Sequence, residues 1–137
     1  GERVLSRQTA DQIRRMLNMV VSPEGTGQRA AVAGYRVAGK TGTAQKPGKG
    51  GYKEGKYVAS FAGFAPVDDP SLVTVVMLDE PSEPYYGGVV AAPVFRRIMA
   101  QGLRLRQVPP EPGRQVAPPP VPLRQAQGAK PKGEQVS

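Results

Sequence analysis

Residues 34–45 read GYRVAGKTGTAQ, and this stretch decides how the rest of the chain is arranged. Tyr35 and Val37 favour extended backbone, and the small residues from Gly39 to Ala44 continue it without bulky side chains. The sequence therefore predicts a strand that starts near Tyr35 and runs to about Ala44. Its glycines would let another chain approach the strand closely.

A helix is predicted upstream of this strand, from about Ser6 to Val21. Ser6 or Thr9 would cap its start, and the helix dipole would favour Asp11 in the first turn. Residues 22–25, SPEG, would end it. Apolar residues recur at helical spacing and give the helix one apolar face, made of Ile13, Met16, Leu17, Val20 and Val21.

Two further strands are predicted downstream. Residues 46–56 hold four glycines and one proline, which predicts a loop. Residues 57–67 alternate as a strand does, and residues 68–71, DDPS, predict a turn. Residues 72–78 form a near-continuous apolar run, typical of a buried central strand. The short connections favour an antiparallel meander.

A second helix is predicted from about Val89 to Leu103. Its apolar face would consist of Val94, Phe95, Ile98 and Met99, and Pro93 would be tolerated only in the first turn. The chain is thus predicted to have an α+β fold, with antiparallel strands flanked by helices. Two helices cover only one face of a short sheet well, so we expect the sheet to continue in a segment outside this chain.

Composition limits both the folded part and the available chemistry. Eight of the fifteen prolines lie between Pro109 and Pro131, so residues 1–107 are predicted to fold and residues 108–137 to form a disordered tail. The 137 residues include neither cysteine nor histidine, which excludes thiolate and Ser-His-Asp chemistry. No metal or other cofactor is expected. The net charge of +8 suits either a solvated surface or a polyanionic partner.

One alternative function is a nucleotide site. Residues 34–41, GYRVAGKT, match the P-loop pattern, and residues 75–80, VVMLDE, resemble the strand and acidic pair that hold magnesium in such proteins. A phosphate-binding loop, however, needs a helix directly after its Lys-Thr pair. Thr41 is followed by GTAQKPG, which does not favour a helix. A non-catalytic basic interaction module is another alternative.

The same residues also form a Lys-Thr-Gly element, which is typical of serine acyl-transferases related to β-lactamases. Lys40 would hold a catalytic hydroxyl or a substrate carboxylate by its charge. Gly42 would leave room for an extended peptide lying along the strand. The hydroxyls of Thr41 and Thr43 would bind a carboxylate.

In five ordered blocks, residues 4–110 resemble the end of the transpeptidase domain of class B penicillin-binding proteins, closest to the division-specific type. The resemblance implies a peptidoglycan D,D-transpeptidase that forms a serine acyl-enzyme and binds penicillins. It implies a catalytic role for Lys40 and for the Thr43 amide in the oxyanion hole, and substrate binding by Thr41, Gly42 and Thr43. It places Tyr85 and Tyr86 in an aromatic wall of the cleft, although covering the sheet edge explains these two residues equally well. The blocks are residues 16–21, 25–27 with 35–45, 57–66, 75–81, and 86–88 with 91–95.

The family's S-x-x-K nucleophile and S-x-N motifs are absent from this chain. No serine is followed by lysine three positions on or by asparagine two positions on. The remainder of the transpeptidase domain is therefore an expected partner, and the isolated chain is expected to be inactive. Peptidoglycan stem peptides, β-lactams and division-complex proteins are the other expected partners; nucleic acid is not. The implied location is the periplasmic face of the bacterial inner membrane, through an N-terminal anchor outside this chain.

Overall fold

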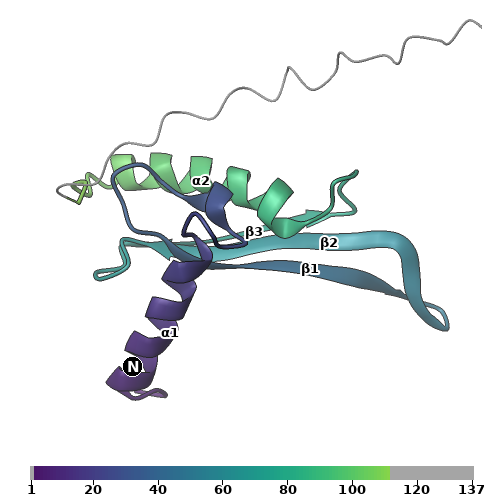
Figure 1. Cartoon of the computed structure of the whole chain (residues 1–137), viewed down its shortest axis with the longest axis horizontal. Helices are drawn as coiled ribbons and strands as arrows, with labels where there is room; N and C mark the ends of the chain where they lie inside the picture. Colours follow the sequence, from purple (N-terminus) through teal and green to yellow (C-terminus); the bar gives the residue numbers. More distant parts are fainter. Residues whose placement is uncertain (1, 112–137) are drawn as a thin grey trace, which may run out of the picture.

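The computed structural model describes residues 2–111, which form two helices and one three-stranded antiparallel sheet of order β1-β2-β3 (Figure 1). The predicted α+β class and antiparallel meander are confirmed. No helix in this range is long and apolar enough to cross a bilayer. The elements are α1 (Arg7–Val20), a 3₁₀ turn η1 (Gln28–Ala30), β1 (Ala38–Gly48), β2 (Gly51–Ala65), β3 (Leu72–Asp79) and α2 (Gly87–Leu105).

Helix α1 forms where predicted but is poorly covered. The Ser6 hydroxyl accepts a hydrogen bond from the Thr9 amide and caps the helix. The first turn contains no acidic residue, so the prediction for Asp11 is wrong; Asp11 pairs with Arg14 in the following turn instead. Because α1 projects away from the sheet (Figure 1), its predicted apolar face stays partly in solvent, and Met16 is 58% exposed.

The predicted loop at 46–56 is wrong, because β1 and β2 continue through it as a two-stranded arm. Gly50 and Gly51 have φ values of 85° and 147°, which only glycine adopts easily, and they make the tight turn. A register shift between Gln45 and Pro47 accommodates the proline in the ladder. The arm extends past the end of β3 at Asp79.

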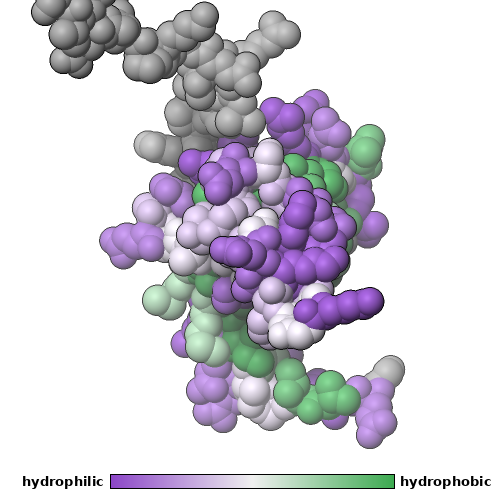
Figure 2. Space-filling model, turned by 90° about the vertical axis from the view of Figure 1, so that its right-hand side faces the viewer, coloured by the Kyte–Doolittle hydropathy of each residue, from purple (hydrophilic) through white to green (hydrophobic). Residues whose placement is uncertain are grey.

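Strand β3 is an edge strand among the described residues, so the predicted central position is not observed. Its side chains alternate: Val76 packs against the core, whereas Val73, Val75 and Met77 are 69%, 61% and 68% exposed. These three residues and Lys40 lie on the face opposite α2, which we call the open face. Figure 2 looks onto the arm and shows hydrophobic side chains gathered below the sheet, on the side to which α1 projects.

The core lies between α2 and the other sheet face. Phe61 of β2 and Phe95 of α2 are fully buried, with ring centroids 4.7 Å apart at 56°. Gly39 and Gly63 face each other across β1 and β2, and a Cβ at either position would run into these rings. Of the predicted apolar face of α2, Phe95 and Met99 are buried, whereas Val94 and Ile98 are exposed.

Pro93 lies inside α2 rather than in its first turn, so its predicted position is wrong. A proline at this position leaves the carbonyl four residues earlier, that of Val89, without its helical partner. The Arg29 guanidinium donates to the Val89 oxygen at 3.4 Å and replaces the missing amide. A side chain from η1 therefore compensates for the proline.

The folded part extends beyond the predicted boundary at residue 107. Val108 packs against the core, and Glu111 hydrogen-bonds to residues 34–36. Val108 to Glu111 are thus in contact with the fold. The rest of the predicted tail, residues 112–137, lies outside the described residues.

Candidate functional site

Residues Lys40 to Thr43 lie in extended conformation on β1. They pair in register with Ala62, Phe61, Ser60 and Ala59 of β2. The other side of β1 carries no strand within residues 2–111, so a peptide could be added there as a further strand. The tetrapeptide therefore forms part of a free strand edge.

This geometry contradicts the nucleotide-site alternative. Thr41 continues into a strand that runs to Gly48, and no helix N-terminus follows it to receive a phosphate. Asp79 and Glu80 do not face Lys40. They form ion pairs with Lys46, at 2.9 Å from each carboxylate, and Glu80 also pairs with Lys56 at 2.8 Å. The acidic pair therefore holds the base of the arm.

The Lys40 ammonium reaches around the strand to its neighbour. Nζ donates to the Thr41 carbonyl at 2.8 Å and to the Thr41 hydroxyl at 3.3 Å. Lys40 starts on the open face, whereas Thr41 faces α2, so these contacts place the positive charge at the strand edge. Lys40 is exposed and has no acidic partner among residues 2–111. Its charge is available to an anionic ligand.

A second hydroxyl joins this group from the loop after α1. The Thr26 and Thr41 hydroxyl oxygens are 3.4 Å apart, within hydrogen-bond distance. The sequence gives no signal for Thr26, because 15 positions separate it from Thr41. Only the turn of residues 22–27 brings the two together.

Thr43 contacts the beginning of α2. The Gly87 amide donates to the Thr43 hydroxyl at 3.0 Å. The N-cap residue of α2, Tyr86, makes no side-chain capping bond, so a threonine from the sheet takes this function. The N-terminal end of α2 carries the positive end of the helix dipole. Lysine charge, threonine hydroxyls and a helix N-terminus thus converge in a region suited to a carboxylate.

Gly42 also lies against a side chain of the neighbouring strand. A Cβ at this position would overlap the hydroxyl oxygen of Ser60, its cross-strand partner. The glycine therefore makes room for a side chain of the neighbouring strand as well as for a peptide at the edge. Like Thr26, Ser60 carries no signal in the sequence that would assign it to the site.

Three tyrosines gather at the end of the sheet next to Thr43. The Tyr85 ring stacks on Tyr57 with centroids 4.0 Å apart, and Tyr86 lies 4.8 Å from Tyr85. The hydroxyls of Tyr86 and Tyr57 raise the pKa of Tyr85 to about 12, which keeps it protonated. Tyr86 is 57% exposed. Tyr85 thus covers part of the sheet, and Tyr86 presents an aromatic surface to solvent.

The base of the arm is fixed by charge. The ammonium groups of Lys56 and Lys46 lower the pKa of Glu80 to about 2, and Asp79 and Glu80 raise the pKa of Lys46. Glu80 has a φ of 47°, and its amide donates to the Tyr57 carbonyl at 2.9 Å. We call Lys46, Lys56, Asp79 and Glu80 the ionic clamp.

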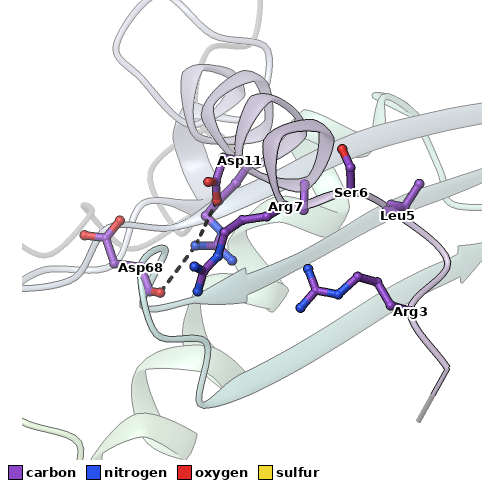
Figure 3. A pocket seen from close by; sticks show the side chains of 8 residues that line it. Arg3, Leu5, Ser6, Arg7, Asp11 and Asp68 are labelled. Carbon is purple, nitrogen blue, oxygen red and sulfur yellow. Dashed lines mark hydrogen bonds and ion pairs between the residues drawn. The ribbon is translucent and has the colours of Figure 1, made fainter.

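A cavity of about 530 Å³ lies elsewhere, between the start of α1 and the β2–β3 turn (Figure 3). Arg14 donates to the Asp68 carbonyl at 3.4 Å and pairs with Asp11. The lining includes none of the residues 40–43. The cavity is therefore not part of the candidate site. That site consists of Lys40, Thr41, Thr43, Thr26 and the start of α2.

A sheet flanked by helices, with Lys-Thr-Gly-Thr on a free edge strand, defines a transpeptidase-type, penicillin-binding fold. Comparison with known families agrees: residues 1–100 match the family model described as "Penicillin binding protein transpeptidase domain". The chain belongs to this family.

The chain spans less than a fifth of the length of the following two relatives. Stage V sporulation protein D of Bacillus subtilis is 52% identical over 103 residues, which are 74% of this chain and 16% of that protein. Peptidoglycan D,D-transpeptidase FtsI of Escherichia coli is 43% identical over 112 residues, 81% of this chain and 19% of that protein.

Solved structures show the same relationship. The transpeptidase domain of Burkholderia pseudomallei penicillin-binding protein 3 superposes with a TM-score of 0.74 at 50% identity, covering 80% of this chain and 34% of that one. Penicillin-binding protein 3 of Mycobacterium tuberculosis, complexed with ampicillin, has a TM-score of 0.72 at 40% identity, covering 83% of this chain and 28% of that one. The chain thus corresponds to about a third of a transpeptidase domain.

Proposed function

We propose that this chain forms one wall of the active site of a peptidoglycan D,D-transpeptidase. The observation that carries the proposal is the position of the Lys40 ammonium beside the Thr41 hydroxyl, on a strand whose outer side pairs with no strand of residues 2–111. A stem peptide would bind along this edge as an added strand. Its terminal carboxylate would meet the lysine charge and the hydroxyls of Thr41 and Thr43.

The reaction needs a serine from another segment. The serine oxygen would attack the carbonyl carbon of the penultimate D-Ala and form the acyl-enzyme bond. The C–N bond to the terminal D-Ala would break, and the serine proton would leave with its amine. The Thr43 amide would stabilise the oxyanion, and an amine from a neighbouring stem peptide would resolve the acyl-enzyme.

Lys40 would belong to the hydrogen-bond network around the serine of the S-x-N motif. Its positive charge would hold the hydroxyl of that serine near the reacting groups. Gly42 would keep the edge accessible to the substrate. Tyr86, and through it the stacked Tyr85, would form an aromatic wall at the end of the site. The similarity to a protein complexed with ampicillin supports penicillin binding by the same groups.

The rest of the transpeptidase domain would cover the open face, where Val73, Val75 and Met77 of β3 are exposed. The similarity to relatives named FtsI and stage V sporulation protein D supports a role in septal cell-wall synthesis, at the periplasmic face of the inner membrane and beside other division proteins. The proposed acyl transfer would require no metal or organic cofactor.

The test is acylation of the full-length protein by a fluorescent penicillin. Replacing Lys40 by alanine should lower the second-order acylation rate by about 100-fold or more, since it removes the fixed charge at the site. Lys49→Ala, at the tip of the arm, is the matched control and should react normally. Equal rates for wild type and Lys40→Ala would refute the proposal. The isolated chain should give no covalent adduct in intact mass spectrometry.

A further inference from the structure

The segment after α2 contacts the chain just before β1. Helix α2 ends in two backbone hydrogen bonds typical of a Schellman motif, Gln107 N to Arg104 O and Val108 N to Leu103 O, both 3.0 Å. Gln107 takes the left-handed conformation that this motif needs, with a φ of 54°. The motif reverses the chain and directs residues 108–111 back across the fold.

Residues 108–111 bind residues 34–36 through several contacts. The Tyr35 hydroxyl donates to the Val108 carbonyl at 2.6 Å, and the Glu111 amide donates to the Gly34 carbonyl at 2.8 Å. The Glu111 carboxylate accepts from the Arg36 backbone amide at 2.9 Å and lies 3.5 Å from Arg36 Nε. Both the backbone amide and the side-chain carboxylate of Glu111 are thus held by residues 34–36.

Arg36 connects this contact to the strand of the site. Its guanidinium also pairs with Asp68 in the β2–β3 turn. Next in the chain is Val37, which is 2% exposed and whose carbonyl accepts from the Asn18 side chain at 2.8 Å. Lys40 lies only four residues after Arg36. The root of β1 is therefore fixed by the C-terminal segment, by the β2–β3 turn and by α1.

We propose that Glu111, acting through Arg36, is a positioning residue for Lys40 and Thr41. Within residues 2–111, strand β1 has a strand neighbour on one side only, so no second strand of this range positions its outer edge. The contacts at its root compensate for this by fixing where the edge begins. This inference rests on the proposed transpeptidase function and assigns the C-terminal segment a part in ligand binding.

The experiment compares Glu111 variants of the full-length protein in penicillin acylation, resolved into initial binding and the acylation step. Glu111→Ala should weaken initial binding about tenfold, because Lys40 and Thr41 are displaced from the ligand carboxylate. Glu111→Gln keeps an acceptor for the Arg36 amide and should restore most of the binding. Glu54→Ala, an exposed carboxylate on the arm, is the control and should match wild type. Rates are normalised to the fraction of protein that becomes acylated, which removes the effect of misfolded molecules.

A purely structural role gives a different result. If Glu111→Ala lowers the melting temperature but the acylatable fraction binds penicillin as wild type does, the positioning role is wrong and the proposed function stands. The role is also wrong if Glu111→Gln binds as weakly as Glu111→Ala. If the wild-type protein is not acylated at all, the proposed function fails, and this inference fails with it.

Discussion

The Gly87 amide donates to the Thr43 hydroxyl, so one residue of the Lys-Thr-Gly-Thr strand caps helix α2. This contact joins two segments that are 44 positions apart in the sequence. It places the positive end of the helix dipole next to the strand edge. The position of the helix and the polarity of the site therefore depend on the same side chain.

Replacing Thr43 by valine should loosen the beginning of α2. Valine has the same shape but offers no acceptor, and loss of a capping acceptor costs about 1 kcal/mol. Amide exchange in residues 86–90 should become about fivefold faster, as measured by mass spectrometry. Thr43→Ser keeps the hydroxyl and should exchange like wild type. Equal exchange in both variants would show that this hydrogen bond contributes little.

Replacing Gly87 by alanine should displace α2 from the sheet. The added Cβ would overlap the backbone oxygens of Ser60 and Gly42, which cannot move without disturbing β1 and β2. Overpacking of this kind costs about 1–3 kcal/mol, so the melting temperature should fall. Penicillin acylation should slow as well, because Gly42 lies in the site strand.

Gly102→Ala is the control for this substitution. It lies in the same helix, and its new Cβ would meet only the flexible end of Leu72. Alanine favours a helix over glycine by about 1 kcal/mol, so this variant should be as stable as wild type or more so. A Gly87→Ala protein that is as stable as Gly102→Ala would contradict the close contact of Gly87 with the backbone oxygens of Ser60 and Gly42.

The ionic clamp should make stability depend on pH. The folded-state pKa of Glu80 is about 2, below its ordinary value of 4.5, so its contribution is complete above about pH 4.5 and is lost as the pH falls through 2. The difference in melting temperature between wild type and Glu80→Gln should therefore shrink as the pH is lowered from about 5 towards 2. The control is Asp69→Asn, in the exposed β2–β3 turn. A wild-type versus Glu80→Gln difference that stays constant over this range would contradict the clamp.

Arg29 should contribute to the stability of the fold only while Pro93 is present. Arg29→Ala leaves the Val89 carbonyl without its partner and should cost about 1 kcal/mol. In a Pro93→Ala background, the restored amide at position 93 would occupy that carbonyl, so Arg29→Ala should cost much less. A double-mutant cycle of melting temperatures measures this coupling. If Arg29→Ala lowers stability equally in both backgrounds, Arg29 does not compensate for Pro93.

Local patterns in the sequence were enough to predict several parts of the fold. Apolar spacing located both helices, and the small residues after Gly39 predicted the site strand in extended form. The residues after Thr41, GTAQKPG, correctly indicated that no phosphate-binding loop and helix follow. The arm at residues 46–56 was missed because its glycines were interpreted as a loop, whereas two of them build the turn of a hairpin whose strands continue on either side.

The misassigned features depend on contacts between distant segments. An apolar run such as residues 72–78 shows that β3 has two apolar faces, but it does not show which elements of this chain cover them. The contact between Thr26 and Thr41, the capping of Gly87 and the binding of Glu111 to Arg36 all depend on how separate elements meet. Single-sequence patterns do not contain that information.

The two outer strands of the sheet differ in how well they resist unwanted association. Charged side chains discourage edge-to-edge pairing, and β1 carries the Lys40 ammonium at its outer edge. Strand β3 presents Val73 to Leu78 with no charged residue before Asp79. If this piece were released by proteolysis, two copies would join through β3, and the resulting dimer would leave the lysine-bearing edge at both ends.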